Sequence, residues 1–245
     1  AAVFGEWARS VGKRLVRALA EHLGKATPGE LEDVVQHALA TLNLDAFALD
    51  AVDEITGELR AMYARAAKAG MVQVKIDPTA EITNLMDDRA QTYSELRAAE
   101  LVGKKLVSGR LVDNPNAKWS ITETTRDHLR LSVMQAVEGG WAPAKLRDAI
   151  LENPAFGKSR AMMIARTELA FAHVAGNVEG WRQSGIVKGK AWILGDLHDV
   201  PDECDLNADA GEVDFDGEFP SGDAWPPAHP RCICDVEPIL QGAEA

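Results

Sequence analysis

Apolar residues recur at every third or fourth position through most of the chain, the spacing that places them on one face of an α-helix. The first such stripe is formed by Trp7, Val11, Leu15 and Leu19. The pattern predicts helices almost throughout residues 1 to about 185. We expect a second helix to start at residue 27, to break near residue 43 and to continue to residue 70, and a third to start at residue 77.

Four turn-forming residues, Asp-Asn-Pro-Asn at 113–116, form the clearest internal boundary. They predict a helical N-terminal arm over residues 1–114 and a second domain over residues 115–245. Within the second domain, we expect helices over residues 119–185, of which the longest runs from about Lys158 to Ser184. A β-rich, acidic tail is expected to follow over residues 186–240.

The pattern changes after Gly185 from a helical period to alternation. The run at 191–194 is a candidate strand, Val213 and Phe215 alternate with Asp214 and Asp216, and residues 233–236 indicate a final edge strand. The predicted fold class is therefore α+β and mostly α-helical. A helical N-terminal half is followed by a helical bundle with a small C-terminal β-rich, Cys/His-containing unit.

Charge is unevenly distributed along the 245 residues. The chain has 38 acidic and 26 basic residues, and eleven of the acidic ones lie between residues 196 and 223, where no Lys or Arg occurs. Such a balance argues against a general nucleic-acid-binding surface. The alternate Asp205, Asn207 and Asp209 resemble a calcium loop, but the glycine follows one position late, so we expect a solvated acidic hairpin.

The first predicted helix carries a basic face formed by Arg9, Lys13, Arg14 and Arg17. A basic amphipathic helix can bind nucleic acid, a membrane surface or an acidic partner, although a solvated face of a packed helix has the same composition. No apolar run approaches the roughly 18 residues that span a bilayer. We therefore expect a soluble protein without a membrane partner, in which the basic face is either a solvated helix face or a candidate site for a protein or nucleic-acid partner.

The strongest candidate for chemistry is a group of metal-ligating residues near the C-terminus: His198, Cys204, His229, Cys232 and Cys234. Zinc takes four thiolate or imidazole ligands, commonly from two short clusters. Structural zinc, free buried thiols and a disulfide formed on exposure to oxidant are all compatible with the spacing. A catalytic zinc would also need an open coordination position and a general base, for which Glu203 is available.

The long helix contains Ala-Arg-Thr-Glu at residues 165–168. A helical projection places Glu168 on the apolar face and Arg166 nearly opposite. A carboxylate on a core-facing stripe requires hydrogen bonds or a cation. We interpret Arg166, Thr167 and Glu168 as a structural latch between this helix and the β-rich tail. The common catalytic signatures HExxH, GxSxG, GxGxxG and the Walker loop do not occur, so we expect no enzyme activity.

Several motifs occur together in a characteristic order. They are Ala-Arg-Thr-Glu at 165–168, Trp192, Phe-Pro-Ser-Gly at 219–222, and His-Pro-Arg-Cys-Ile-Cys at 229–234. Over residues 117–238 the chain resembles the Mu F-like minor head proteins of tailed phages, also called head morphogenesis proteins. Two positions depart from the family pattern. Pro201 stands at the first cysteine of a usual CxxC pair that ends at Cys204, and Ile233 stands where the family usually has Arg.

The resemblance implies a structural virion protein that associates with the portal during procapsid assembly and aids DNA packaging or ejection. It implies a location inside the capsid near the portal, and in the host cytoplasm during assembly. Its expected partners are the portal protein, the major capsid or scaffolding protein and packaged DNA. The alternative is a zinc-dependent hydrolase that uses the C-terminal Cys/His cluster on nucleic acid or a cell-wall component.

Overall fold

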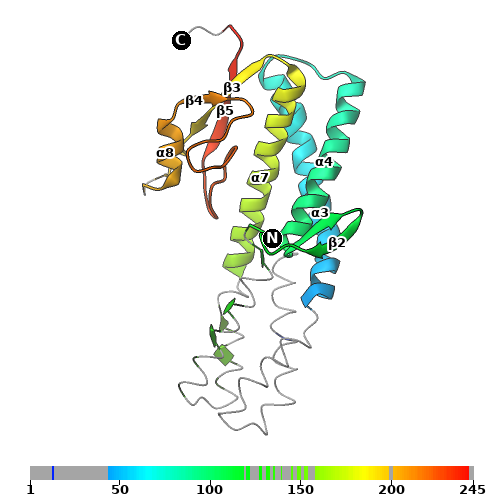
Figure 1. Cartoon of the computed structure of the whole chain (residues 1–245), viewed down its shortest axis with the longest axis vertical. Coiled ribbons are helices and arrows are strands. Elements are labelled where there is room, and N and C mark those ends of the chain that lie inside the picture. The colour runs from blue at the N-terminus through cyan, green and yellow to red at the C-terminus, as the bar shows by residue number, and fades with distance from the viewer. Residues whose placement is uncertain are drawn as a thin grey trace. The chain divides into compact units, whose positions relative to one another are not determined.

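The computed structural model describes residues 44–118, 158–198 and 201–242, together with Lys13 and single residues or short runs between 120 and 153 (Figure 1). The predicted helix start at residue 27 and the break near residue 43 lie outside these residues. So do three of the four residues of the basic face, Arg9, Arg14 and Arg17. Lys13 is helical and exposed.

Three long helices dominate the described part of the chain. They are α3 (Leu44–Gln73), α4 (Ala80–Leu101) and α7 (Lys158–Ser184). The bounds predicted for the helix from 158 to 184 are confirmed. Helix α4 begins after Thr79, whose hydroxyl oxygen accepts a hydrogen bond from the backbone N–H of Ile82 at 3.3 Å. None of the described helices is long and apolar enough to cross a membrane.

Helices α3 and α7 approach each other closely through glycine. A Cβ at Gly70 of α3 would lie 2.6 Å from the carbonyl oxygen of Asn177, and a Cβ at Gly176 or Gly180 of α7 would meet the backbone of α3 in the same way. Ala67 and Met71 are fully buried beside this contact. Because glycine has no side chain, two helix backbones can pack here without an intervening layer of atoms.

A β-hairpin follows α4, where the sequence pattern predicts a helical arm over residues 1–114 and no strand. Strands β1 (Lys104–Val107) and β2 (Arg110–Asp113) pair antiparallel in a two-stranded sheet. Ser108 and Gly109 connect them with φ angles of 50° and 75°. Two consecutive positive φ values are the conformation that a two-residue hairpin turn requires. The Ser-Gly pair between two apolar dipeptides was the local signal for this turn.

The C-terminal unit is built on a three-stranded antiparallel sheet of order β4-β3-β5. Its strands are β3 (Val187–Ile193), β4 (Glu212–Asp214) and β5 (Asp235–Leu240). All three overlap the predicted strands, although β3 begins four residues earlier than expected. On one face of the sheet, the buried Trp192 contacts Phe219 edge-to-face, with ring centroids 5.1 Å apart. The α+β class with a Cys/His-containing strand unit is thereby confirmed.

The acidic segment forms a helix, so the expected acidic hairpin is wrong for residues 203–209. Helix α8 (Glu203–Asp209) starts with a reciprocal capping box between Asp202 and Asp205. The side chain of Asp202 accepts from the backbone N–H of Cys204 at 2.8 Å, and Asp205 accepts from the N–H of Asp202 at 2.8 Å. These two bonds satisfy backbone donors that a helix start otherwise leaves without partners.

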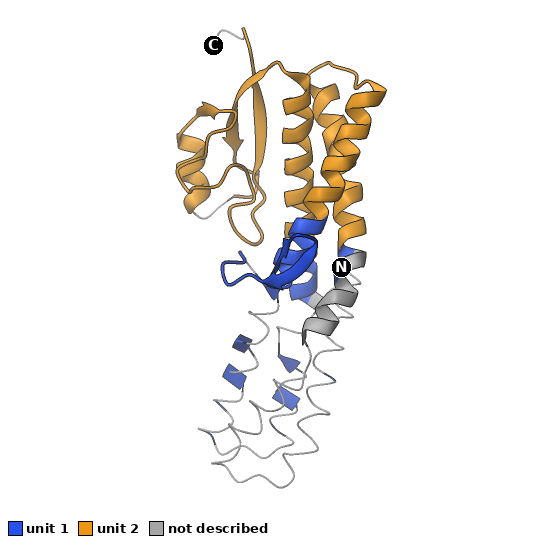
Figure 2. Cartoon of the chain, turned by 45° about the vertical axis from the view of Figure 1, so that its right-hand side comes forward, with its two compact units in different colours: residues 1–55, 95–162 blue, residues 56–94, 163–245 orange. Residues whose placement is uncertain are grey.

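The chain divides into two compact units (Figure 2). Residues 1–55 and 95–162 make up the first unit, and residues 56–94 and 163–245 make up the second. The domain boundary predicted at residue 114 lies within the first unit, and the division into 1–114 and 115–245 stays a prediction. Both the α3–α7 contact and the Cys/His cluster belong to the second unit.

Candidate metal centre

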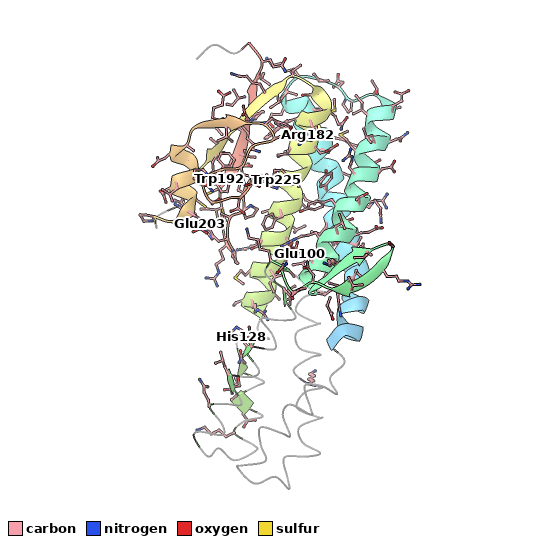
Figure 3. The ribbon with its side chains drawn as sticks, viewed as in Figure 1. Glu100, His128, Arg182, Trp192, Glu203 and Trp225 are labelled. Carbon is pink, nitrogen blue, oxygen red and sulfur yellow. The ribbon has the colours of Figure 1, made fainter. Side chains whose placement is uncertain are left out.

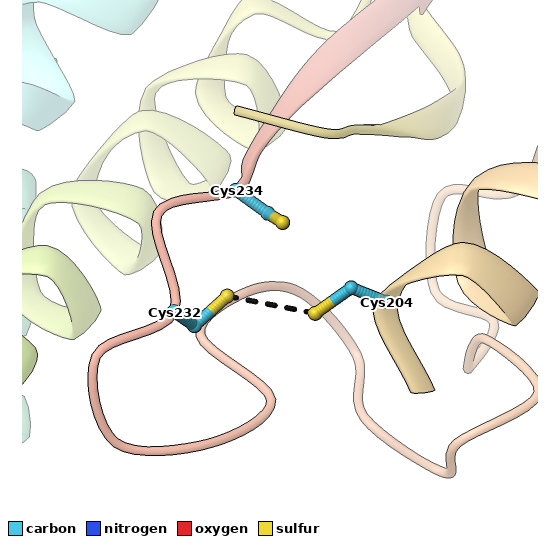
Figure 4. A group of neighbouring side chains, drawn as sticks. All are labelled: Cys204, Cys232 and Cys234. Carbon is cyan, nitrogen blue, oxygen red and sulfur yellow. Dashed lines mark hydrogen bonds between the residues drawn. The ribbon is translucent and has the colours of Figure 1, made fainter. Parts of the chain in front are cut away.

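Three cysteines converge in the C-terminal unit from two segments of the chain (Figure 4). Cys204 comes from the first turn of α8, whereas Cys232 and Cys234 come from the loop that leads into β5. The Sγ atoms of Cys204 and Cys232 are 3.7 Å apart, and all three sulfurs lie within 4.8 Å of one another. The Nε2 atom of His229, from the same loop, lies 3.5 Å from the Sγ of Cys204.

Local backbone structure holds these side chains in place. The capping box of α8 fixes the backbone of Cys204 through Asp202. In the loop, the backbone N–H of Cys232 donates to the carbonyl oxygen of His229 at 3.1 Å, and Arg231 between them has a φ of 70°. This tight turn brings His229 and Cys232 to the same side of the loop.

The donor set and its spacing suit a metal ion. A tetrahedral zinc with thiolates at about 2.3 Å and imidazole at about 2.0 Å separates two sulfurs by about 3.8 Å, and a sulfur from a nitrogen by about 3.5 Å. The two distances from the Sγ of Cys204, 3.7 Å to the Sγ of Cys232 and 3.5 Å to the Nε2 of His229, match these ligand–ligand separations. Cys204, Cys232, Cys234 and His229 could therefore hold a metal ion, with Cys204 at the centre of the group.

The imidazole of His229 faces acceptors on both ring nitrogens. Its Nδ1 lies 3.0 Å from the carbonyl oxygen of Pro230, which can only accept, so Nδ1 carries a hydrogen. The other nitrogen, Nε2, faces both the Sγ of Cys204 and Oδ2 of Asp202 at 3.1 Å. The Nε2 of His229, the Sγ of Cys204 and a carboxylate oxygen of Asp202 lie within 4.8 Å of one another, so a proton or a metal cation can lie between them. A backbone acceptor on Nδ1 is the common second-shell arrangement of a histidine that binds metal through Nε2.

Burial disfavours free thiolates at this centre. It raises the pKa of the Cys204 thiol, and the neighbouring Cys232 raises that pKa further. Burial likewise raises the pKa of Cys232. Without a cation these thiols are protonated near neutral pH, whereas a bound metal ion displaces the protons and stabilises the thiolates.

His198 lies beside the centre rather than among the cysteines. Its Nε2 is 3.0 Å from Oδ2 of Asp205 and 3.9 Å from Oδ1 of Asp202. The hydrogen bond from His198 lowers the pKa of Asp205. Asp202, which sequence reasoning missed, connects both histidines, because its second oxygen contacts His229. The signal for Asp202 was the Asp-x-x-Asp spacing of the capping box. Glu203, the candidate general base, is exposed on α8 (Figure 3).

Thr167, one of the three residues of the predicted latch, contacts the loop before β5. Its hydroxyl donates to the carbonyl oxygen of Met163 at 2.9 Å and accepts the backbone N–H of Arg231 at 3.3 Å. This contact joins α7 directly to the loop of the metal centre. Glu168 is 3% exposed, as its place on the apolar face predicts, and Arg166 is exposed on the opposite side.

A buried lysine supports the same unit and was not predicted. Lys190 of β3 is fully buried, and its ammonium donates to the carbonyl oxygens of Phe215 at 2.7 Å and Gly217 at 2.8 Å. The ring centroids of Phe219 and Trp225 each lie 5.8 Å from the same ammonium nitrogen. Burial lowers the pKa of Lys190. The ammonium therefore fixes the loop after β4 against the central strand.

Comparison with family models, curated proteins and solved structures finds no match to this chain.

Proposed function

We propose that this chain is a structural minor head protein of a tailed phage, which associates with the portal during procapsid assembly and aids DNA packaging or ejection. One observation carries the proposal. The Ala-Arg-Thr-Glu motif of α7 and the His-Pro-Arg-Cys-Ile-Cys loop meet through the bond from the Arg231 N–H to Thr167, across 64 positions of sequence. Two motifs that characterise the family on separate segments thus form one contact, which supports a common structural role.

We propose further that the metal centre binds one structural zinc ion per chain through Cys204, Cys232, Cys234 and His229. Sulfur and imidazole donors favour zinc over magnesium or calcium, which prefer oxygen ligands. Four protein ligands leave no open position for a substrate water, so this set favours a structural zinc over the catalytic zinc of a hydrolase. His198, which could have replaced the family cysteine missing at Pro201, contacts carboxylates, so His229 beside the Sγ of Cys204 is the proposed fourth ligand.

The zinc proposal is tested by elemental analysis of the reduced full chain, with Cys234→Ser and His198→Asn compared with the wild type. We expect about one zinc per chain in the wild type and in His198→Asn, and a large loss in Cys234→Ser. His198→Asn is the matched control because it removes a nearby histidine that contacts carboxylates instead of sulfur. Reduced wild-type protein without zinc would refute the proposed site.

Portal association is tested by co-sedimentation of the full chain with rings of the portal protein encoded beside its gene. We propose that the basic face of the first helix is the binding arm, so Arg14→Glu with Arg17→Glu is expected to abolish co-sedimentation. Arg60→Glu with Lys105→Glu is the control, because it makes the same charge change at two exposed sites. Point variants are preferable to truncation, because removing α3 would expose its buried contact with α7.

The partners beyond the portal are distinguished in the same assay. Shells of the major capsid protein, with or without scaffolding protein, and double-stranded DNA replace the portal rings. If the Arg14→Glu and Arg17→Glu variant loses binding to DNA and still binds portal rings as the wild type does, that result would assign the basic face to packaged DNA. If neither the rings, the shells nor the DNA retain the wild-type chain, the minor head proposal fails.

A further inference from the structure

The three cysteines differ in their access to solvent. Cys204 is 0% exposed and Cys234 is 9% exposed, whereas Cys232 is half-buried on the loop before β5. Of the three thiols, Cys232 is therefore the one that a small molecule reaches first. The Sγ of Cys204 lies 3.7 Å from the Sγ of Cys232 (Figure 4).

We infer that, in the metal-free chain, Cys232 is a thiol–disulfide exchange site for small disulfides such as oxidised glutathione, with Cys204 as the resolving thiol. The product is a Cys204–Cys232 disulfide that excludes the metal ion. The pairing depends only on the geometry of the thiols. The exclusion of metal rests on the proposed zinc site.

The exchange proceeds in two balanced steps. The Cys232 thiolate attacks one sulfur of oxidised glutathione, which forms a mixed disulfide and releases one glutathione thiolate. Cys204 then attacks the Cys232 sulfur and loses its proton, which forms the intramolecular disulfide and releases the second glutathione as a thiol. Two protein thiols are oxidised, one small disulfide is reduced to two thiols, and the two protons leave with the released glutathione.

The geometry favours this pairing over the alternatives. A disulfide needs its sulfurs about 2.05 Å apart, so the separation of 3.7 Å must shorten by less than 2 Å. Rotation of the half-buried Cys232 side chain can supply this movement while its backbone stays in the turn with His229. Cys204 is held by the capping box of α8 and Cys234 lies directly before β5, so both are anchored more firmly.

Oxidation of this pair has a direct consequence for metal binding. It consumes two of the three thiolates and leaves only Cys234 and His229 as donors of the proposed set. Two protein ligands do not complete the tetrahedral site of a structural zinc. The metal-bound and disulfide forms therefore exclude each other, so that bound zinc protects both cysteines from exchange and oxidation blocks reloading.

The test uses the full chain, stripped of metal with a chelator and treated with oxidised glutathione at mildly alkaline pH. Free thiols are counted with a chromogenic reagent, and the linked peptides are identified by mass spectrometry. We expect loss of two of the three thiols, a peptide that links Cys204 to Cys232, and a Cys234 that still reacts with an alkylating agent. Cys204→Ser is expected to accumulate the mixed disulfide on Cys232, because its resolving thiol is absent.

Cys234→Ser is the matched control, because it removes a neighbouring thiol but leaves the proposed pair, and it is expected to form the same linkage as the wild type. Cys232→Ser and Cys232→Ala are both expected to lose rapid reaction with glutathione, and circular dichroism under reducing conditions establishes that at least one is folded. A linkage through Cys234 would overturn the inference. So would equal retention of glutathione by the wild type and Cys204→Ser.

Metal binding is then measured on the oxidised and the re-reduced chain. Zinc binding that is lost on oxidation and returns with reductant supports the inference that the disulfide and the metal ion exclude each other. Stoichiometric zinc on the disulfide form overturns it. If the reduced chain binds no zinc at all, the proposed zinc site fails, and the peptide map still decides whether Cys204 pairs with Cys232.

Discussion

Replacing Gly180 with alanine tests the close contact between α3 and α7 that supports the C-terminal unit. A Cβ at this position would lie well inside 3.0 Å of the carbonyl oxygen of Ala67, and 3.0 Å from the backbone nitrogen of Met71. Ordinary van der Waals contact begins near 3.4 Å. Because both neighbours are backbone atoms of α3, neither can move aside by changing a side-chain rotamer, and the two helices must separate.

Two opposing terms set the magnitude. Alanine in a helix interior is favoured over glycine by up to about 1 kcal/mol. Overpacking of a close-packed interior costs about 1–3 kcal/mol and more where the backbone must shift. Since several atoms of Ala67 and Met71 are too close, we expect the overpacking term to exceed the gain, with a net loss of roughly 2 kcal/mol in the free energy of unfolding. For a chain of this size that corresponds to a fall of about 4–8 °C in Tm.

The assay is urea unfolding followed by circular dichroism, with Gly57→Ala as the control. Gly57 lies in α3 as well, but a Cβ added there meets nothing within 4 Å, so alanine is expected to stabilise the chain by about 0.5–1 kcal/mol. The two substitutions are chemically identical and are predicted to have opposite signs. If Gly180→Ala unfolds at the same or a higher urea concentration than the wild type, the close contact between the helices is wrong.

Three further predictions concern the latch and the helix that carries Cys204. Thr167→Val should destabilise the chain by about 1 kcal/mol and speed hydrogen exchange of the Arg231 amide, because that N–H loses its acceptor. Thr167→Ser keeps the hydroxyl and should preserve both the stability and the slow exchange. Unchanged exchange of the Arg231 amide in the valine variant would contradict the latch. Glu168→Ala should cost about 1–3 kcal/mol in denaturant melts, because it removes a buried carboxylate and strands its partners, and a neutral result would show that the carboxylate is solvated. The hydrogen bond from His198 lowers the pKa of Asp205, so its stabilising effect is present above the pKa of an ordinary aspartate and is lost as the pH falls through the lowered value. Asp205→Asn should therefore flatten the acid side of a plot of urea midpoint against pH, and an unaltered profile would rule out this contact as its source.

The amino-acid sequence determined the features that depend on short-range patterns. The long helix from Lys158 to Ser184 follows from its start and stop signals and its apolar period, and the burial of Glu168 follows from the helical projection of that period. The clustering of the three cysteines and two histidines near the C-terminus indicates a metal centre, although free thiols or a disulfide fit the same spacing. Local signals existed for the Ser108–Gly109 turn as well, but the surrounding helical pattern outweighed them.

Tertiary structure alone decided which side chains meet. Whether His198 or Asp202 contacts His229 depends on how α8 packs against the loop before β5, and the alternation of acidic residues gave no indication of that packing. The motif at 165–168 predicts a contact between the long helix and the tail, but only the tertiary structure identifies the backbone N–H of Arg231, 64 positions away, as the partner of Thr167. The burial of Lys190 depends on aromatic rings and carbonyl oxygens that the chain brings around it only after the sheet has formed. Helix period, turns and caps depend on residues that are neighbours in the sequence. These contacts instead depend on the packing of many residues that are far apart in the sequence.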